Sequence, residues 1–97
     1  MRRLGLLLAL AGCKPTEVGL ARRLEAANHC QVPSDCVDLG SFCPFGCNQV
    51  VHVDEAPALR QALTKFLEDG RDTCPLDCEP VAAIRCDAFR CVPVYGQ

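Results

Sequence analysis

The sequence predicts a small, disulfide-rich α+β domain, in which one amphipathic helix packs on a few short antiparallel strands. Three observations predict this class. The chain has 97 residues and nine cysteines, which is close to the cysteine content of disulfide-stapled exported domains. One clearly amphipathic helical pattern lies between residues 54 and 70, and short stretches that favour strands flank it. A chain of this length forms at most one domain, and its core needs covalent support.

The amino terminus has the layout of an export signal. Two arginines precede an apolar run from Leu4 to Leu10, which ends in Ala11-Gly12-Cys13. The run is too short to span a bilayer, because a membrane-spanning helix needs about 20 apolar residues. It fits the apolar region of a secretory signal instead.

The four residues Leu10-Ala11-Gly12-Cys13 resemble the lipobox of bacterial lipoproteins. The resemblance implies that residues 1–12 are removed as a signal segment and that Cys13 carries the lipid, with acyl chains such as palmitate. It therefore implies an exported protein that is lipid-anchored to the bacterial cell envelope. Lys14 stands where some bacteria use an aspartate for inner-membrane retention, which favours the outer membrane. The competing interpretation is an ordinary buried apolar segment that ends in a cysteine.

The cysteine count supports export independently. Without Cys13, eight of the nine cysteines remain. An even number suits four disulfides, and an exported chain enters a compartment where disulfides persist. The expected disulfide cysteines are Cys30, Cys36, Cys43, Cys47, Cys74, Cys78, Cys86 and Cys91.

Residues 13–28 hold the lipidated cysteine and a short predicted helix. Thr16 suits its N-cap, and apolar residues recur at helical spacing. These residues are Val18, Ala21, Leu24 and Ala27. We expect a tether that holds the domain off the membrane. The alternative is a helix whose arginines touch anionic headgroups.

The disulfide-stapled domain is expected to span residues 29–97. Its first part is rich in turn residues, with a short strand near Val37 and Leu39. Residues 49–53 are largely β-branched and predict a second strand, with Val51 and Val53 on one face.

The central helix is predicted to begin at the N-cap Asp54 and to end at Gly70. Its apolar face consists of Leu59, Leu63, Phe66 and Leu67. Such a face must be covered. We expect the cover to be a hairpin made of residues 81–86 and 91–95, with the strand that contains Pro93 at an edge because proline cannot donate to a ladder.

Two disulfide arrangements are open from spacing alone. Neighbouring cysteines can pair locally, or the first four can pair with the last four across the helix. We expect at least two bonds between the clusters, because a longer closed loop restricts the unfolded chain more. A zinc site is the competing use of the two Cys-x3-Cys pairs, Cys43/Cys47 and Cys74/Cys78. The export signal argues against it.

Residues 30–91 resemble a group of small exported bacterial proteins with eight cysteines, often behind a lipobox. The shared features are Asp35 before Cys36, the Cys-Pro-x-x-Cys of residues 43–47, the central helix, and the closing Cys86 and Cys91. This resemblance implies no particular activity. A likeness to whey-acidic-protein inhibitor domains is weaker, because the chain lacks their adjacent Cys-Cys pair.

No set of side chains predicts catalysis, so we expect no enzyme, no cofactor and no metal site. His52 lies in a valine-rich stretch and is interpreted as an ordinary solvent-facing or hydrogen-bonded histidine. His29 adjoins Cys30, but a cysteine in a disulfide cannot act as a nucleophile. The net charge of −2 and the lack of a basic patch give a nucleic-acid role no electrostatic support. Two function classes remain. One is a non-catalytic lipoprotein that presents a rigid surface to a protein or glycan partner. The other is a protease inhibitor with a stiff binding loop.

Overall fold

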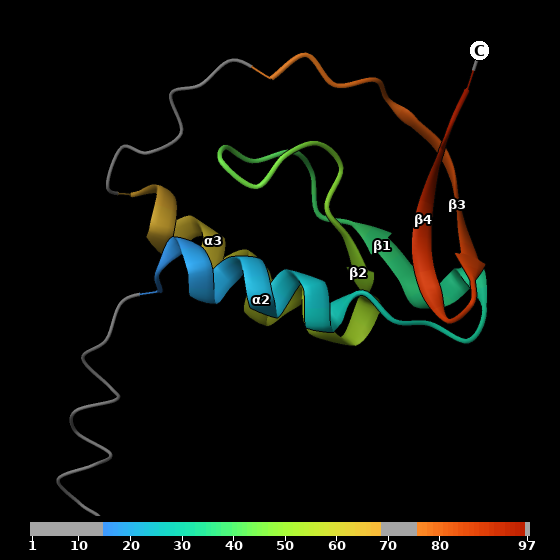
Figure 1. Cartoon of the computed structure of the whole chain (residues 1–97), viewed down its shortest axis with the longest axis horizontal. Coiled ribbons are helices and arrows are strands. Elements are labelled where there is room, and N and C mark those ends of the chain that lie inside the picture. Colours follow the sequence, from blue (N-terminus) through green and yellow to red (C-terminus); the bar gives the residue numbers. More distant parts are fainter. Residues whose placement is uncertain (1–14, 69–75, 97) are drawn as a thin grey trace, which may run out of the picture.

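The computed structural model describes residues 15–68 and 76–96, and shows the expected small disulfide-rich α+β fold. The elements of the described residues are the helices α2 (Glu17–Ala27) and α3 (Ala56–Leu67), the strands β1 (Cys36–Asp38), β2 (Val50–His52), β3 (Val81–Asp87) and β4 (Arg90–Tyr95), and the 3₁₀ turns η1 (Pro33–Asp35) and η2 (Val53–Glu55). The strands form two antiparallel pairs, β1–β2 and β3–β4. Figure 1 shows α2 and α3 beside each other, with the β3–β4 hairpin at the opposite end of the molecule.

Helix α2 belongs to the core of the domain, which corrects the prediction of a tether. Leu20 is completely buried and Leu24 and Ala27 nearly so, whereas Val18 is 62% exposed. The buried residues follow one row of the helix, four and three residues apart, which is the spacing that faces a neighbour. The expected apolar face was therefore wrong at Val18 and at Ala21, which are both exposed, and it omitted Leu20. Thr16 caps the helix as predicted, accepting a hydrogen bond from the Gly19 N–H.

Helix α3 buries the face that the sequence predicts, but it packs on a different partner. Leu59, Leu63 and Phe66 are buried, and they share one cluster with α2 and with Val51 of β2. The β3–β4 hairpin lies elsewhere, so the expected cover of the helix was wrong. Because α2 supplies a second apolar face, α3 packs on α2. The β3–β4 hairpin is attached by disulfides instead.

Two local predictions around α3 are corrected. Glu55, rather than Asp54, occupies the N-cap position of the helix, and the Asp54 N–H instead donates to the Nδ1 atom of His52. Val53 lies in η2 and is 46% exposed, while Val50 and Val51 are both buried. Strand β2 is therefore covered on both faces and carries no alternating pattern. Gly70, the expected end of the helix, lies outside the described residues.

The β3–β4 hairpin matches its predicted position, and its geometry explains Pro93. Cys86 and Cys91 lie directly opposite each other, as do Ile84 and Pro93. Counted from the two-residue turn at Ala88 and Phe89, these are the positions whose backbone groups point away from the partner strand. Pro93 therefore removes no ladder hydrogen bond, as expected for an edge strand.

Candidate functional site

The cysteines join the two clusters, as the crossed arrangement predicts. Among the described residues, three bonds join the clusters: Cys30–Cys86, Cys36–Cys91 and Cys47–Cys78, at sequence separations of 56, 55 and 31. Taken singly, loops of this length stabilise the fold by about 4 kcal/mol, against about 2 kcal/mol for the local pairs. The prediction of at least two bonds between the clusters is confirmed. Cys43 is also disulfide-bonded, and Cys13 and Cys74 lie outside the described residues.

The disulfides attach the hairpin to the segment that follows α2. Cys86 and Cys91 are cross-strand neighbours, and their partners Cys30 and Cys36 lie on either side of η1. The sulfur atoms of Cys30, Cys36 and Cys91 gather closely enough to resemble a metal-ligand group. All three are oxidised, so they offer no thiolate to a metal. The zinc alternative gains no support from these residues.

Asn28 holds the free edge of β4. The Cys91 N–H donates to Asn28 Oδ1 at 2.6 Å, and Asn28 Nδ2 donates to the Cys91 carbonyl oxygen at 3.2 Å. The side-chain amide thus takes the place of a neighbouring strand. Beside it, Arg90 forms an ion pair with Glu25 of α2 at 3.0 Å. This role of Asn28 could not be predicted from a local pattern, because the contact joins residues 63 positions apart.

A groove lies between α2, the loop that follows Gly40, and β4. It has a volume of about 430 Å³ and combines apolar groups with amides and carboxylates. Leu24, Phe45 and Pro93 supply apolar surface, and Glu17 and Gln49 are among its polar residues. The ring of Phe45 packs against the ring of Phe66 of α3, with the ring centroids 5.5 Å apart. A concave site of this mixed chemistry can bind a ligand.

The turn of the hairpin presents an exposed aromatic ring in a strained backbone. Ala88 and Phe89 have φ angles of 50° and 64°, a region that non-glycine residues occupy at a cost of about 1–2 kcal/mol each. Phe89 is 72% exposed, and its carbonyl oxygen accepts a hydrogen bond from the Cys30 N–H at 3.0 Å. Strain of this kind persists only where the surrounding structure imposes it. Here the two-residue connection between the paired residues Asp87 and Arg90 imposes it, because such a hairpin turn requires positive φ at both central residues.

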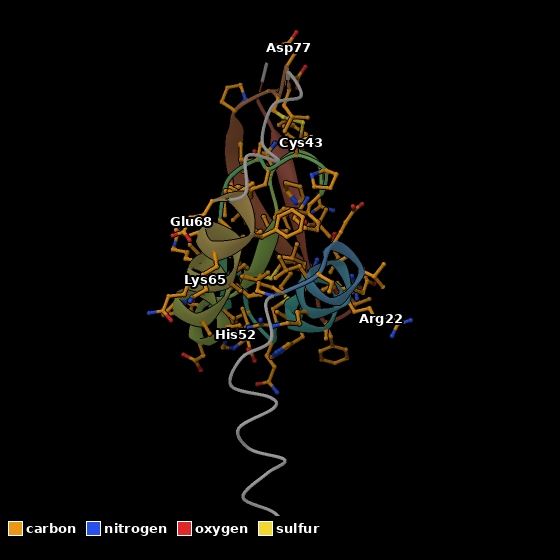
Figure 2. All side chains as sticks on the ribbon, turned by 90° about the vertical axis from the view of Figure 1, so that its left-hand side faces the viewer. Arg22, Cys43, His52, Lys65, Glu68 and Asp77 are labelled. Carbon is orange, nitrogen blue, oxygen red and sulfur yellow. A yellow bond between two sulfur atoms is a disulfide. The ribbon has the colours of Figure 1, made fainter. Side chains whose placement is uncertain are left out.

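The two histidines of the chain meet at the end of the domain that lies away from the loop that follows Gly40. The rings of His29 and His52 stack with their centroids 4.8 Å apart and an interplanar angle of 26°. Figure 2 shows His52 toward the bottom of the view and Cys43 toward the top. The pairing of the two histidines could not be predicted from the sequence, because no local pattern connects residues on different elements.

Carboxylates surround the histidine pair. Glu55 Oε2 lies 3.8 Å from His29 Nε2, and Asp54 Oδ2 lies 3.8 Å from His52 Nδ1. Asp35 is a third. Hydrogen bonds from the backbone N–H groups of Gln31 and Val32 are the main reason that the pKa of Asp35 is lowered, and the two histidines lower it further. The site is thus rich in nitrogen and oxygen donors.

The chain was compared with protein-family models, with curated proteins and with solved structures, and no match was found. In the described segments, residues 15–68 and 76–96, no helix is long and apolar enough to cross a membrane. The disulfides indicate an oxidising compartment outside the cytoplasm.

Proposed function

We propose that this protein is an exported, lipid-anchored component of the bacterial cell envelope, whose disulfide-rigid domain binds a partner and catalyses no reaction. The observation that carries the proposal is the disulfide framework, because disulfides persist only in an oxidising compartment. The lipobox-like Leu10-Ala11-Gly12-Cys13 supplies the route of export and the anchor.

The number of cysteines left for pairing depends on whether Cys13 carries the lipid. Six described cysteines pair with one another, and Cys43 is disulfide-bonded to none of them. Lipidation of Cys13 requires that Cys43 pair with Cys74. The proposal therefore predicts this fourth bond, and a Cys13–Cys43 bond in the isolated protein would contradict it.

The position of α2 determines how an anchored domain would sit. Only residues 14–16 separate Cys13 from Glu17, the first residue of α2. Three extended residues reach roughly 10 Å, and α2 is part of the core rather than a spacer. The domain would thus rest close to the bilayer. Glu17 also lines the groove, so the groove would open beside the membrane surface.

The anchor is tested by replacing Cys13 with serine. Several acyl chains hold a protein stably on a membrane, whereas a chain without them has no such hold. We expect Cys13→Ser to move the protein out of the membrane fraction or to leave it unprocessed. Val18→Ala, an exposed change outside the lipobox, serves as the matched control and should remain in the membrane fraction. Normal trimming and membrane association of the serine variant would contradict the proposal.

Binding at the groove is tested by obstructing it. Ala21 lines the groove and is exposed, so Ala21→Arg adds bulk and charge without disturbing the core. Val18→Arg adds the same side chain to α2, but Val18 does not line the groove. Crosslinking of the anchored protein to its neighbours should lose its partner in the first variant and keep it in the second. Equal crosslinking in both would place binding elsewhere.

The conformation of the hairpin turn argues against the alternative that the protein is a protease inhibitor. A protease cleft binds an extended segment, whereas the turn at Ala88 and Phe89 has positive φ angles. We therefore expect no inhibition of a panel of serine proteases by the oxidised protein. Stoichiometric inhibition would favour the alternative.

A further inference from the structure

We propose that the groove beside α2 receives the cationic side chain of a lysine or arginine of a protein partner, which rests on the proposed role of this groove in binding. The groove lies between α2, the loop that follows Gly40, and β4. Three features of its lining favour a cation: the sign of its charge, the orientation of its amide groups, and an aromatic ring beside apolar surface.

The charged side chains that line the groove are all acidic. Glu17 and Glu25 line it, and among the described residues its lining contains no lysine, arginine or histidine. Glu25 already has a partner, because its Oε2 atom lies 3.0 Å from the guanidinium group of Arg90. The Glu17 side chain is exposed and has no ion pair within residues 15–68 and 76–96. Its carboxylate is therefore available, and a positive charge complements it.

Two amide side chains of the groove use their N–H groups inside the protein. Asn48 Nδ2 donates to the Glu79 carbonyl oxygen and to the Tyr95 hydroxyl, each at 3.1 Å. Gln49 Nε2 donates to the Phe45 carbonyl oxygen at 3.0 Å. Within the described part of the chain, Oδ1 of Asn48 and Oε1 of Gln49 accept no hydrogen bond. Both oxygens can accept from a ligand, and ammonium and guanidinium groups consist of donors alone.

Apolar surface beside these acceptors suits the aliphatic part of the same side chain. Leu24, Pro44 and Pro93 line the groove together with Phe45. Lysine and arginine bury their methylene stems on apolar surface while their charged ends stay at polar groups. The Phe45 ring can add attraction, because the face of an aromatic ring attracts a cation, and the ring packs against Phe66. The volume of about 430 Å³ is within the range of small-ligand sites, so it has room for one long side chain.

The test is a titration of the oxidised full chain carrying Cys13→Ser with two synthetic peptides. One is acetyl-Ala-Lys-Ala-Lys-Ala-amide, and the other has glutamate in place of both lysines. In nuclear magnetic resonance spectra, the lysine peptide should shift the side-chain amide signals of Asn48 and Gln49 in a saturable way. It should bind at least tenfold more tightly than the glutamate peptide, and added salt should weaken it because exposed charges are screened.

Matched variants locate the bound cation. Glu17→Gln should weaken binding of the lysine peptide about threefold, as expected for an exposed ion pair. Glu68→Gln, which changes a carboxylate at the end of α3 outside the groove, should leave binding unchanged. Ala21→Arg places a cation of the chain itself beside the groove and should abolish binding of the peptide.

Three results would overturn the inference: equal binding of the two peptides, no saturable shift, or an unchanged affinity in Glu17→Gln. These results are distinguishable from failure of the proposed function. If Ala21→Arg loses the crosslinked partner of the anchored protein, the groove remains the binding site and only the cationic nature of its ligand is refuted. If Ala21→Arg keeps that partner, the proposed binding role of the groove is itself contradicted.

Discussion

Replacing Leu20 with alanine tests directly whether α2 is part of the core. The Leu20 side chain is 0% exposed and packs in one cluster with residues of α3 and β2. A buried leucine truncated to alanine loses its transfer free energy and leaves a cavity, and typically costs about 2–5 kcal/mol. We expect a loss of about 3 kcal/mol. A small domain has a total stability of about 5–15 kcal/mol, so this is a large fraction.

The assay is urea unfolding of the oxidised chain carrying Cys13→Ser, followed by circular dichroism. For a small protein with a slope of about 1 kcal/mol per molar urea, a loss of about 3 kcal/mol should lower the midpoint by about 3 M. Val18→Ala is the control on the same helix. Val18 is 62% exposed, and alanine favours the helix slightly, so its effect should stay within about 0.5 kcal/mol. If both variants unfold at the parent midpoint, α2 is a tether and the packing described above is wrong.

Four further outcomes follow from the same contacts. Trypsin digestion without reduction should leave the peptide Leu24–Arg60 linked to later peptides, because the disulfides Cys30–Cys86, Cys36–Cys91 and Cys47–Cys78 cross between the clusters; its release as a free oxidised peptide would contradict them. Asn28→Ala should cost about 1–3 kcal/mol in urea unfolding, since it leaves two backbone groups of β4 without partners; an unchanged midpoint would show that water replaces the amide. The double change Ala88→Asn and Phe89→Gly should raise stability by about 1 kcal/mol, because these residues suit positive φ; a loss would mean that the Phe89 ring stabilises the fold. Asp35→Asn should lower the free energy of unfolding near neutral pH, and the gap to the parent protein should shrink as the pH falls below about 4. The reason is that a carboxyl whose pKa is lowered by folding stabilises the folded state above its unfolded pKa, and this stabilisation is lost as the pH falls through the folded pKa. A gap in unfolding free energy that does not change with pH would refute this cause.

The sequence by itself determined the class of the fold and the positions of most elements. The repeat of Leu59, Leu63 and Phe66 can face a core only as a helix, and these three residues are buried as expected. The turn residues and β-branched stretches located the strands within a few residues. The lack of a large core predicted covalent support, and the advantage of long loops predicted bonds between the clusters. These conclusions depend on the local periodicity of apolar residues and on the entropy of closing loops of known length, and both can be worked out from the sequence.

Only the tertiary structure decided what each element packs on. Two rows of α2 satisfy a helical spacing, one through Val18 and one through Leu20, and the neighbouring helix selects the second. In the same way, α3 could cover any apolar surface, and it covers α2 and β2 because the disulfides fix the hairpin elsewhere. Two further contacts join residues that are distant in the chain. His29 stacks on His52, and Asn28 hydrogen-bonds to the backbone of β4. Such contacts depend on how the elements are placed in space, and no local pattern in the sequence contains that placement.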